Sequence, residues 1–183
     1  MAKLRSVCVY CGTRTGNEPA FEALAEEAGR RVAQAGYRLV FGGGTAGLAG
    51  IAARAAADAG GTVLGVIPEF LIPVEGAFEG IELRKVATLG ARKSMMIAES
   101  DGFLALPGGT GTLEEVFDLL TRRNLGLENK PVAFVDNQFW GPFSTLLDHV
   151  VRYEFTDPAL VDGLSFEPDI QSALAALRIG EPG

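Results

Sequence analysis

Residues 102–115 read GFLALPGGTGTLEE, and this stretch indicates the fold class of the chain more clearly than any other. Its first five residues are apolar or small, as in a strand that is buried on both faces. The glycines that follow lack a Cβ, so their backbone N–H groups can approach a ligand closely. The helix predicted from Thr112 adds a partial positive charge at its N-terminus, which favours an anion such as a phosphate. The order strand, glycine loop, helix therefore predicts an α/β fold with a phosphate site.

Glu115 has two interpretations on the sequence alone. Thr112-x-x-Glu115 matches a capping box, in which each side chain satisfies a free backbone donor at a helix start. Alternatively, the carboxylate lies one turn inside the helix and acts on whatever the phosphate carries. The run Gly108, Gly109 and Gly111 favours the second interpretation, because a helix cap needs no such run.

The whole chain alternates between short apolar runs and segments of helical periodicity. We predict strands at 6–10, 38–41, 62–67, 82–86, 102–106 and 131–135, and helices at 19–35, 47–59, 91–100, 112–123, 141–154 and 169–178. Such alternation is typical of a three-layer α/β fold with a mostly parallel sheet and right-handed crossovers. The sequence thus predicts a single Rossmann-like domain over residues 1–183, with a loose tail at 179–183.

Three glycine loops each follow a predicted strand: one begins at Gly12, one spans 42–47 and one spans 108–111. In a parallel sheet these loops meet at the carboxyl edge, where ligands bind near a switch in strand order. We therefore expect phosphate contacts from the loop glycines Gly12, Gly43, Gly44 and Gly108. Residues 42–47 match the G-x-G-x-x-G fingerprint, but they follow the second strand, so a mononucleotide is favoured over a nicotinamide dinucleotide.

Charge and composition exclude several classes of function. The chain of 183 residues carries 16 basic and 23 acidic side chains, with no basic stripe, which argues against a nucleic-acid partner. It has no leader-like segment and no apolar span of membrane length, so we expect a cytoplasmic protein with no membrane partner. Cys8 and Cys11 form C-x-x-C, but His149 is the single histidine, so we expect no metal site and a structural role for both thiols.

Arg92 and Lys93 stand at the start of another predicted helix, in the run Gly90-Ala91-Arg92-Lys93. Two cations there oppose the helix dipole, so they are a poor choice for stability alone. The functional interpretation is that the planar guanidinium of Arg92 binds an oxyanion. The alternative is a solvated helix end.

Together these motifs resemble the Lonely Guy family of cytokinin riboside 5′-monophosphate phosphoribohydrolases, long labelled possible lysine decarboxylases. The family motif P-G-G-x-G-T-x-x-E is met by residues 107–115, and the resemblance also includes 9–12, 42–50 and the Arg92-Lys93 pair. It implies a homodimer in which Arg92 and Glu115 form the catalytic pair. It further implies substrate contacts from Glu75, Arg92, Lys93, Gly109, Thr110, Gly111, Thr112, Leu113, Glu114 and Thr121.

The expected activity is hydrolysis of the N-glycosidic bond of AMP or a cytokinin riboside 5′-monophosphate, giving free base and ribose 5-phosphate without metal or cofactor. Glu115 would orient or deprotonate the attacking water, and Arg92 would hold Glu115 or the substrate. Two alternatives stay open: a carrier of a nucleotide or pterin cofactor, and a pyridoxal-phosphate decarboxylase using Lys85 or Lys93. The substituent on the base also stays open, because Leu89-Gly90-Ala91 replaces the Met-His-x of plant members.

Overall fold

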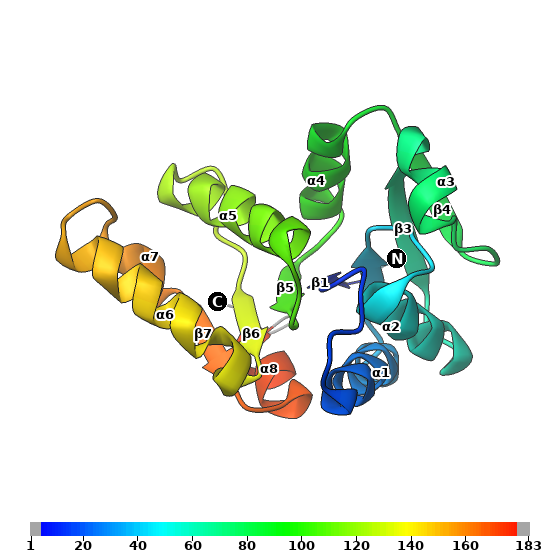
Figure 1. Ribbon diagram of the computed structural model, residues 1–183, viewed down its shortest axis with the longest axis horizontal. Coiled ribbons are helices and arrows are strands. Elements are labelled where there is room, and N and C mark those ends of the chain that lie inside the picture. The colour runs from blue at the N-terminus through cyan, green and yellow to red at the C-terminus, as the bar shows by residue number, and fades with distance from the viewer. Residues whose placement is uncertain (1–4, 179–183) are drawn as a thin grey trace.

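One seven-stranded sheet organises the molecule, and all of its strand pairs are parallel. The computed structural model describes residues 5–178, so the tail predicted to be loose lies outside the described residues. The order across the sheet is β4-β3-β2-β1-β5-β6-β7 (Figure 1). The strands are β1 (Ser6–Tyr10), β2 (Arg38–Phe41), β3 (Val63–Pro68), β4 (Glu82–Val86), β5 (Gly102–Ala105), β6 (Val132–Val135) and β7 (Leu164–Glu167).

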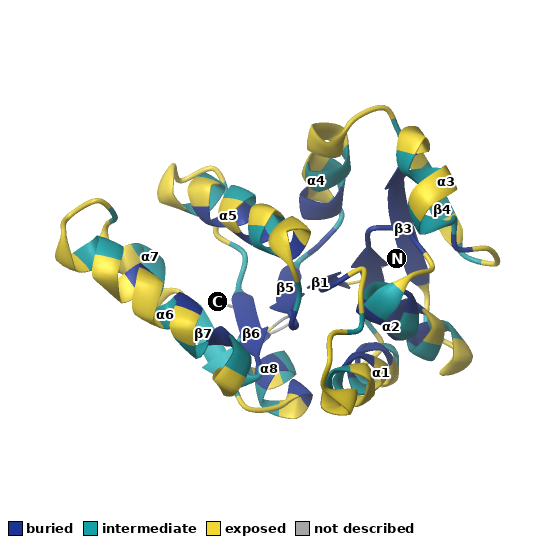
Figure 2. Cartoon of the chain, viewed as in Figure 1, coloured by how far each residue is buried: buried dark blue, intermediate teal, exposed yellow. Residues whose placement is uncertain are grey.

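Helices cover both faces of the sheet, which confirms the three-layer α/β fold (Figure 1). One face packs against α1 (Pro19–Gln34), α2 (Gly47–Asp58) and α8 (Ile170–Leu177), and the other against α4 (Leu89–Ala98), α5 (Thr110–Asn124), α6 (Asn137–Arg152) and α7 (Pro158–Asp162). The central strands are buried throughout, whereas the edge strand β7 is only half-buried (Figure 2). None of the helices between residues 5 and 178 is long and apolar enough to cross a membrane.

Several elements differ from those expected. The strand β7 and the short helices α3 (Ile72–Glu75) and α7 were not predicted, and a 3-10 turn, Glu69–Leu71, precedes α3. The helix α6 begins at Asn137 rather than 141, because the Asp136 carboxylate accepts hydrogen bonds from the N–H groups of Gln138 and Phe139. The helices α4 and α5 each begin two residues earlier than predicted.

The strand order reverses between β1 and β5, which places a topological switch there. The loops that leave these two strands touch, since the Gly12 N–H donates to the Pro107 carbonyl at 3.1 Å. The first and third glycine loops therefore lie side by side, as the sequence predicted for the carboxyl edge of the sheet.

Candidate functional site

The start of α5 is open to a ligand. Gly109 is the N-cap residue in an extended conformation, and no side chain of the described residues caps it. Thr110 and Gly111 begin the helix and are exposed, and a Cβ placed on Gly109 or Gly111 would meet no atom within 4 Å. The first N–H groups of α5 therefore have no side chain in front of them, and such groups bind anions.

The capping-box interpretation of Glu115 is wrong. Because α5 begins at Thr110, Thr112 is the third helical residue and Glu115 the sixth, so neither can form the reciprocal bonds of a box. Thr112 is instead buried beneath the loop, where a Cβ on Gly108 would lie 2.1 Å from its hydroxyl. Glu115 has to be explained by something other than helix capping.

Arg92 lies against the second glycine loop. A Cβ on Gly42 would be 1.7 Å from a terminal nitrogen of the Arg92 guanidinium, so only glycine allows this contact. The same guanidinium is 3.8 Å from the Glu75 carboxylate, and the two side chains are 12% and 17% exposed. Arg92 Nε and Glu75 Oε2 are buried and have no hydrogen-bond partner among residues 5–178, so each has capacity left for polar groups of a ligand.

Glu75 reaches the site from the end of α3, not from a loop as predicted. Thr45 fixes this position by donating its backbone N–H and its hydroxyl to the Glu75 carbonyl at 3.0 and 3.1 Å. Gly44 packs against the Glu75 side chain, whereas a Cβ on Gly43 would point at β3 and β4. Of the two predicted loop glycines, Gly44 is therefore the nearer to the ion pair.

Burial raises the pKa of Glu115 to about 7. The charge of Arg92 opposes this shift, Glu114 and Glu75 increase it, and Lys93 opposes it again. A carboxyl group with a pKa near neutrality can give up and take up a proton at working pH, which is what a general base requires. The structure thus brings Glu75, Arg92 and Glu115 into one electrostatic cluster at the edge of the sheet.

Lys93 adjoins this cluster but is engaged in ion pairs. Its ammonium group contacts the Glu114 carboxylate and lies 3.7 Å from Asp118, and its side chain is 13% exposed. Asp118 was not nominated from the sequence. Its spacing of four residues from Glu114 on a helix is the signal that could have revealed it.

Two predicted contacts lie away from the cluster. Leu113 packs against the apolar core beneath α5. Thr121 is exposed, eleven residues beyond Thr110, which is about 16 Å along the helix at 1.5 Å per residue. The cluster within one chain is therefore built from α3, α4 and the first two turns of α5.

The thiols in β1 and directly after it do not add a nucleophile to the site. Cys8 and Cys11 are both buried and free, and they pack into the cores on opposite faces of the sheet. Burial, followed by the charge of Glu115, raises the pKa of both thiols, and burial also raises that of Tyr10. These groups stay neutral at working pH, in keeping with the structural role predicted for both cysteines.

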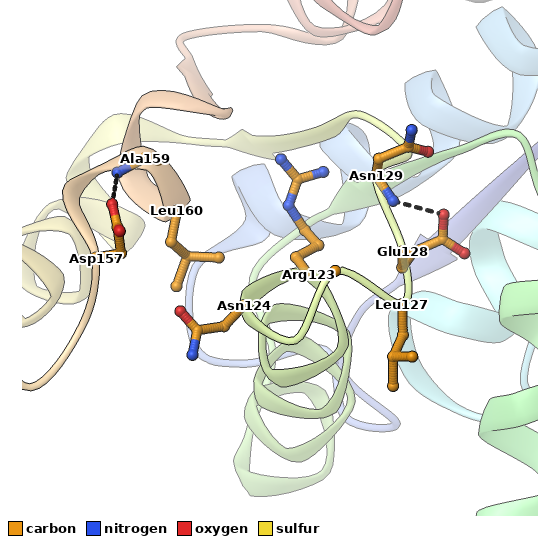
Figure 3. A pocket seen from close by; sticks show the side chains of 9 residues that line it. Arg123, Asn124, Leu127, Glu128, Asn129, Asp157, Ala159 and Leu160 are labelled. Atoms are coloured by element: carbon orange, nitrogen blue, oxygen red, sulfur yellow. Dashed lines mark hydrogen bonds between the residues drawn. The ribbon is translucent and has the colours of Figure 1, made fainter.

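A hollow of about 580 Å³ lies at the opposite end of α5 (Figure 3). Arg123 extends into it from the last turn of the helix, and the loop 126–129 and the start of α7 form its other walls. None of the nominated site residues lines it, so it is distinct from the cluster at the start of α5.

The fold is that of a Rossmann-like α/β protein, and an uncapped helix start lies at its topological switch point. A family model described as "Possible lysine decarboxylase" matches residues 49–177. The chain is 42% identical over 177 residues to a cytokinin riboside 5′-monophosphate phosphoribohydrolase of Rhodococcoides fascians, covering 95% of this chain and 89% of the relative. It is 34% identical over 183 residues to LOG7 of Arabidopsis thaliana, covering 99% and 84%. The chain therefore belongs to the Lonely Guy family.

Solved structures show the same fold at lower identity. The molybdenum cofactor binding protein of Rippkaea orientalis has a TM-score of 0.71 and 19% identity, covering 95% of this chain and 96% of its own. The Moco carrier protein of Chlamydomonas reinhardtii has a TM-score of 0.70 and 23% identity, covering 96% of each chain. At these identities the likeness concerns the fold alone.

Proposed function

We propose that the protein hydrolyses the N-glycosidic bond of adenosine-type nucleoside 5′-monophosphates, releasing the base and ribose 5-phosphate. The observation that carries this proposal is the Glu115 carboxyl group, whose pKa is raised to about 7 beside Arg92 on the helix with the open start. The relatives in Rhodococcoides fascians and Arabidopsis thaliana, named as cytokinin riboside 5′-monophosphate phosphoribohydrolases, support the same activity.

The chemistry follows from the positions of the charges. The 5′-phosphate binds the N–H groups of α5 and the adjoining glycine loops, which fixes the ribose by contacts remote from the reacting bond. Glu115 takes a proton from the water that attacks the anomeric carbon, and its negative charge stabilises the oxocarbenium character of the transition state. The bond from this carbon to the base nitrogen breaks in the same reaction, and the base takes up one proton as it leaves. Arg92, being too basic to donate a proton readily, holds Glu115 and the substrate in place.

Glu75 and Arg92 are proposed to bind polar groups of the substrate. Glu75 Oε2 can accept and Arg92 Nε can donate a hydrogen bond, since both are buried without a partner in the described structure. Burying such atoms unpaired is unfavourable, so a substrate that satisfies both gains affinity.

The geometry does not favour lysine decarboxylation on pyridoxal phosphate. A Schiff base requires a lysine amine that is free to attack a carbonyl. Lys93 is held between the Glu114 and Asp118 carboxylates, and Lys85 lies exposed on the edge strand β4. Neither lysine is presented next to the open start of α5 as an unengaged amine.

A homodimer in the cytoplasm is also proposed. The outward stripe of α5 contains Glu114, Phe117 and Thr121 and continues into Leu125, and Phe117 and Leu125 are 42% and 64% exposed. Exposed apolar side chains on one helix face are typical of a surface that a partner covers. A second copy packed on this stripe would place Thr121 at the seam between subunits.

The test is chromatography of the products formed from AMP, from N6-isopentenyladenosine 5′-monophosphate and from adenosine. We expect free base and ribose 5-phosphate from the two monophosphates. Because the phosphate anchors the substrate, kcat/KM for AMP should exceed that for adenosine by on the order of 10²-fold or more. Absence of base release from either nucleotide, or equal kcat/KM for AMP and adenosine, would contradict the proposal.

A further inference from the structure

Charged side chains of α4 and α5 alternate along the seam between the two helices. The Lys93 ammonium contacts Glu114 and lies 3.7 Å from Asp118 Oδ1, while Arg122 Nε donates to Asp118 Oδ2 at 3.0 Å. Arg122 then donates from its terminal nitrogen to the Ser94 hydroxyl at 3.1 Å. Asp118 is the centre of this network, because one of its oxygens faces the lysine and the other the arginine.

The sequence spacing explains how the network forms. Glu114, Asp118 and Arg122 are four residues apart and share one face of α5, and Lys93 and Ser94 are consecutive on α4. Lys93 is only 13% exposed and Asp118 only 26% exposed. Screening by water is weaker for such half-buried pairs than for surface pairs, so they constrain geometry more strongly.

The network adjoins the catalytic pair on both helices. Arg92 precedes Lys93 on α4, and Glu115 follows Glu114 on α5. On the basis of the proposed function, we propose that Asp118 is a positioning residue. By holding Lys93 between α4 and α5, it keeps Arg92 and Glu115 at the separation that hydrolysis of the nucleotide requires.

Several charges act on Glu115 from the elements packed around it. They are Arg92 and Lys93 of α4, Glu75 of α3 and Glu114 of α5. The neutral thiols of Cys8 and Cys11 and the phenol of Tyr10 also interact with Glu115. Lys93 stabilises the ionised form of Glu115, but its charge is shared with Glu114 and Asp118. Changing Asp118 or Arg122 should therefore alter the titration of Glu115 without contact with substrate.

The experiment compares Asp118→Asn with Arg122→Met in AMP hydrolysis between about pH 5 and pH 9. In Asp118→Asn, kcat should fall about 10- to 100-fold, whereas KM should stay within about threefold of the wild-type value. The reason is that Arg92 and Glu115 lose their alignment while the protein keeps its affinity for AMP. The acidic limb of the kcat/KM profile should move to lower pH. Without the negative charge of Asp118, the positive charge of Lys93 stabilises the ionised form of Glu115 more strongly. Arg122→Met removes the positive charge that lies beside Asp118, so the acidic limb of this variant should move to higher pH.

Three further measurements make the test decisive. Asp118→Glu restores the charge and should recover most of kcat. Glu27→Gln is the control, because it breaks a comparable ion pair between residues four apart, Arg31 and Glu27 at 3.3 Å, on the opposite face of the sheet. This variant should leave kcat and the acidic limb of kcat/KM unchanged. Carbon-13 NMR titration of the Glu115 carboxyl reads the two opposite shifts even if no turnover occurs, which separates failure of this inference from failure of the proposed function.

The inference is overturned if Asp118→Asn keeps the wild-type kcat and acidic limb. It is equally overturned if both variants lose activity while the Glu115 titration stays in place, since that pattern indicates a general loss of packing. If Asp118→Asn does not fold, Arg122→Met alone decides: a shift to higher pH supports the inference, and no shift or a shift to lower pH overturns it.

Discussion

At the residue scale, the account depends on a carboxyl group placed where its charged form is unfavourable. Glu115 is only partly exposed, its pKa is raised mainly by burial, and Arg92 only partly compensates. An uncharged side chain at this position would stabilise the folded protein more than a carboxylate does. Such a conflict between stability and side-chain identity is typical of functional sites.

The first prediction concerns stability in Glu115→Gln. The folded-state pKa of about 7 lies above the ordinary value of 4.5. Wild-type stability from this group is therefore fully present below the ordinary value and is lost as pH rises through about 7. The variant should match the wild type under acidic conditions and exceed it by on the order of 1–3 kcal/mol at alkaline pH. Urea unfolding across this range checks the prediction, and parallel stability curves for the two proteins would contradict it.

Arg92 and Glu115 could be proposed from local motifs, and Glu75 only through the family resemblance, whereas Asp118 was not nominated. Residues 107–115 and the cation pair at 92–93 are local motifs, so they can be recognised in the sequence alone. Glu75 and Asp118 gain their meaning from groups distant in sequence, Arg92 and Lys93, which only the packing of α3, α4 and α5 brings near. The capping interpretation failed because the start of α5 was placed two residues late.

At the scale of elements, the loop after one strand positions residues of two neighbouring helices. The loop after β2 positions Arg92 of α4 through Gly42, and it also anchors α3 through Thr45. The glycines of this loop therefore leave room for residues of the neighbouring elements.

The second prediction is that Gly42→Ala folds but loses activity. Its new Cβ would overlap the Arg92 guanidinium, whose flexible end has to move away from the ion pair with Glu75. We expect kcat/KM for AMP to fall at least about tenfold with little change in Tm, since misplacement by about 1 Å is enough for such losses. Gly141→Ala is the matched control: it meets nothing within 4 Å inside α6, so it should keep full activity and gain stability. Unchanged kcat/KM in Gly42→Ala would refute the role of this contact.

The buried strands could be predicted, whereas the half-buried strand β7 and the four-residue helix α3 could not. The strands β1 and β6 are buried throughout and β2 is buried after Arg38, and all three consist mainly of apolar residues, so their pattern is unambiguous. The edge strand β7 is half-buried along its length, and α3 spans only four residues. Neither segment therefore shows a clear periodicity of apolar residues in the sequence. Pro142 lies inside α6, five residues after its start at Asn137, although proline is more common at the start of a helix.

At the scale of the whole molecule, sheet topology places the site. The strand order reverses between β1 and β5, and the loops that follow both strands carry glycines. The alternation of strands and helices was sufficient to predict this edge, because parallel strands present all their following loops on one side.

The third prediction concerns assembly. Light scattering should give a mass of about 38 kDa, twice the chain mass of 19.2 kDa, as for a symmetric dimer. Phe117→Ser on the outward stripe of α5 should shift the population toward the monomer, because it removes exposed apolar area from the proposed seam. Glu22→Ser on α1, which covers the other face of the sheet, should leave the dimer intact. A wild-type monomer with full activity at micromolar concentration would contradict the prediction.

The most direct test of the central claim is the turnover of AMP by Glu115→Gln, measured beside its affinity for AMP. If Glu115 is the base that activates water, kcat should fall by on the order of 10²–10⁴ while AMP still binds and the protein stays folded. Arg92→Ala should also be nearly inactive, and the double variant should lose far less than the product of the two single effects, because the residues act as a unit. Turnover of AMP by Glu115→Gln at the wild-type rate would contradict the account.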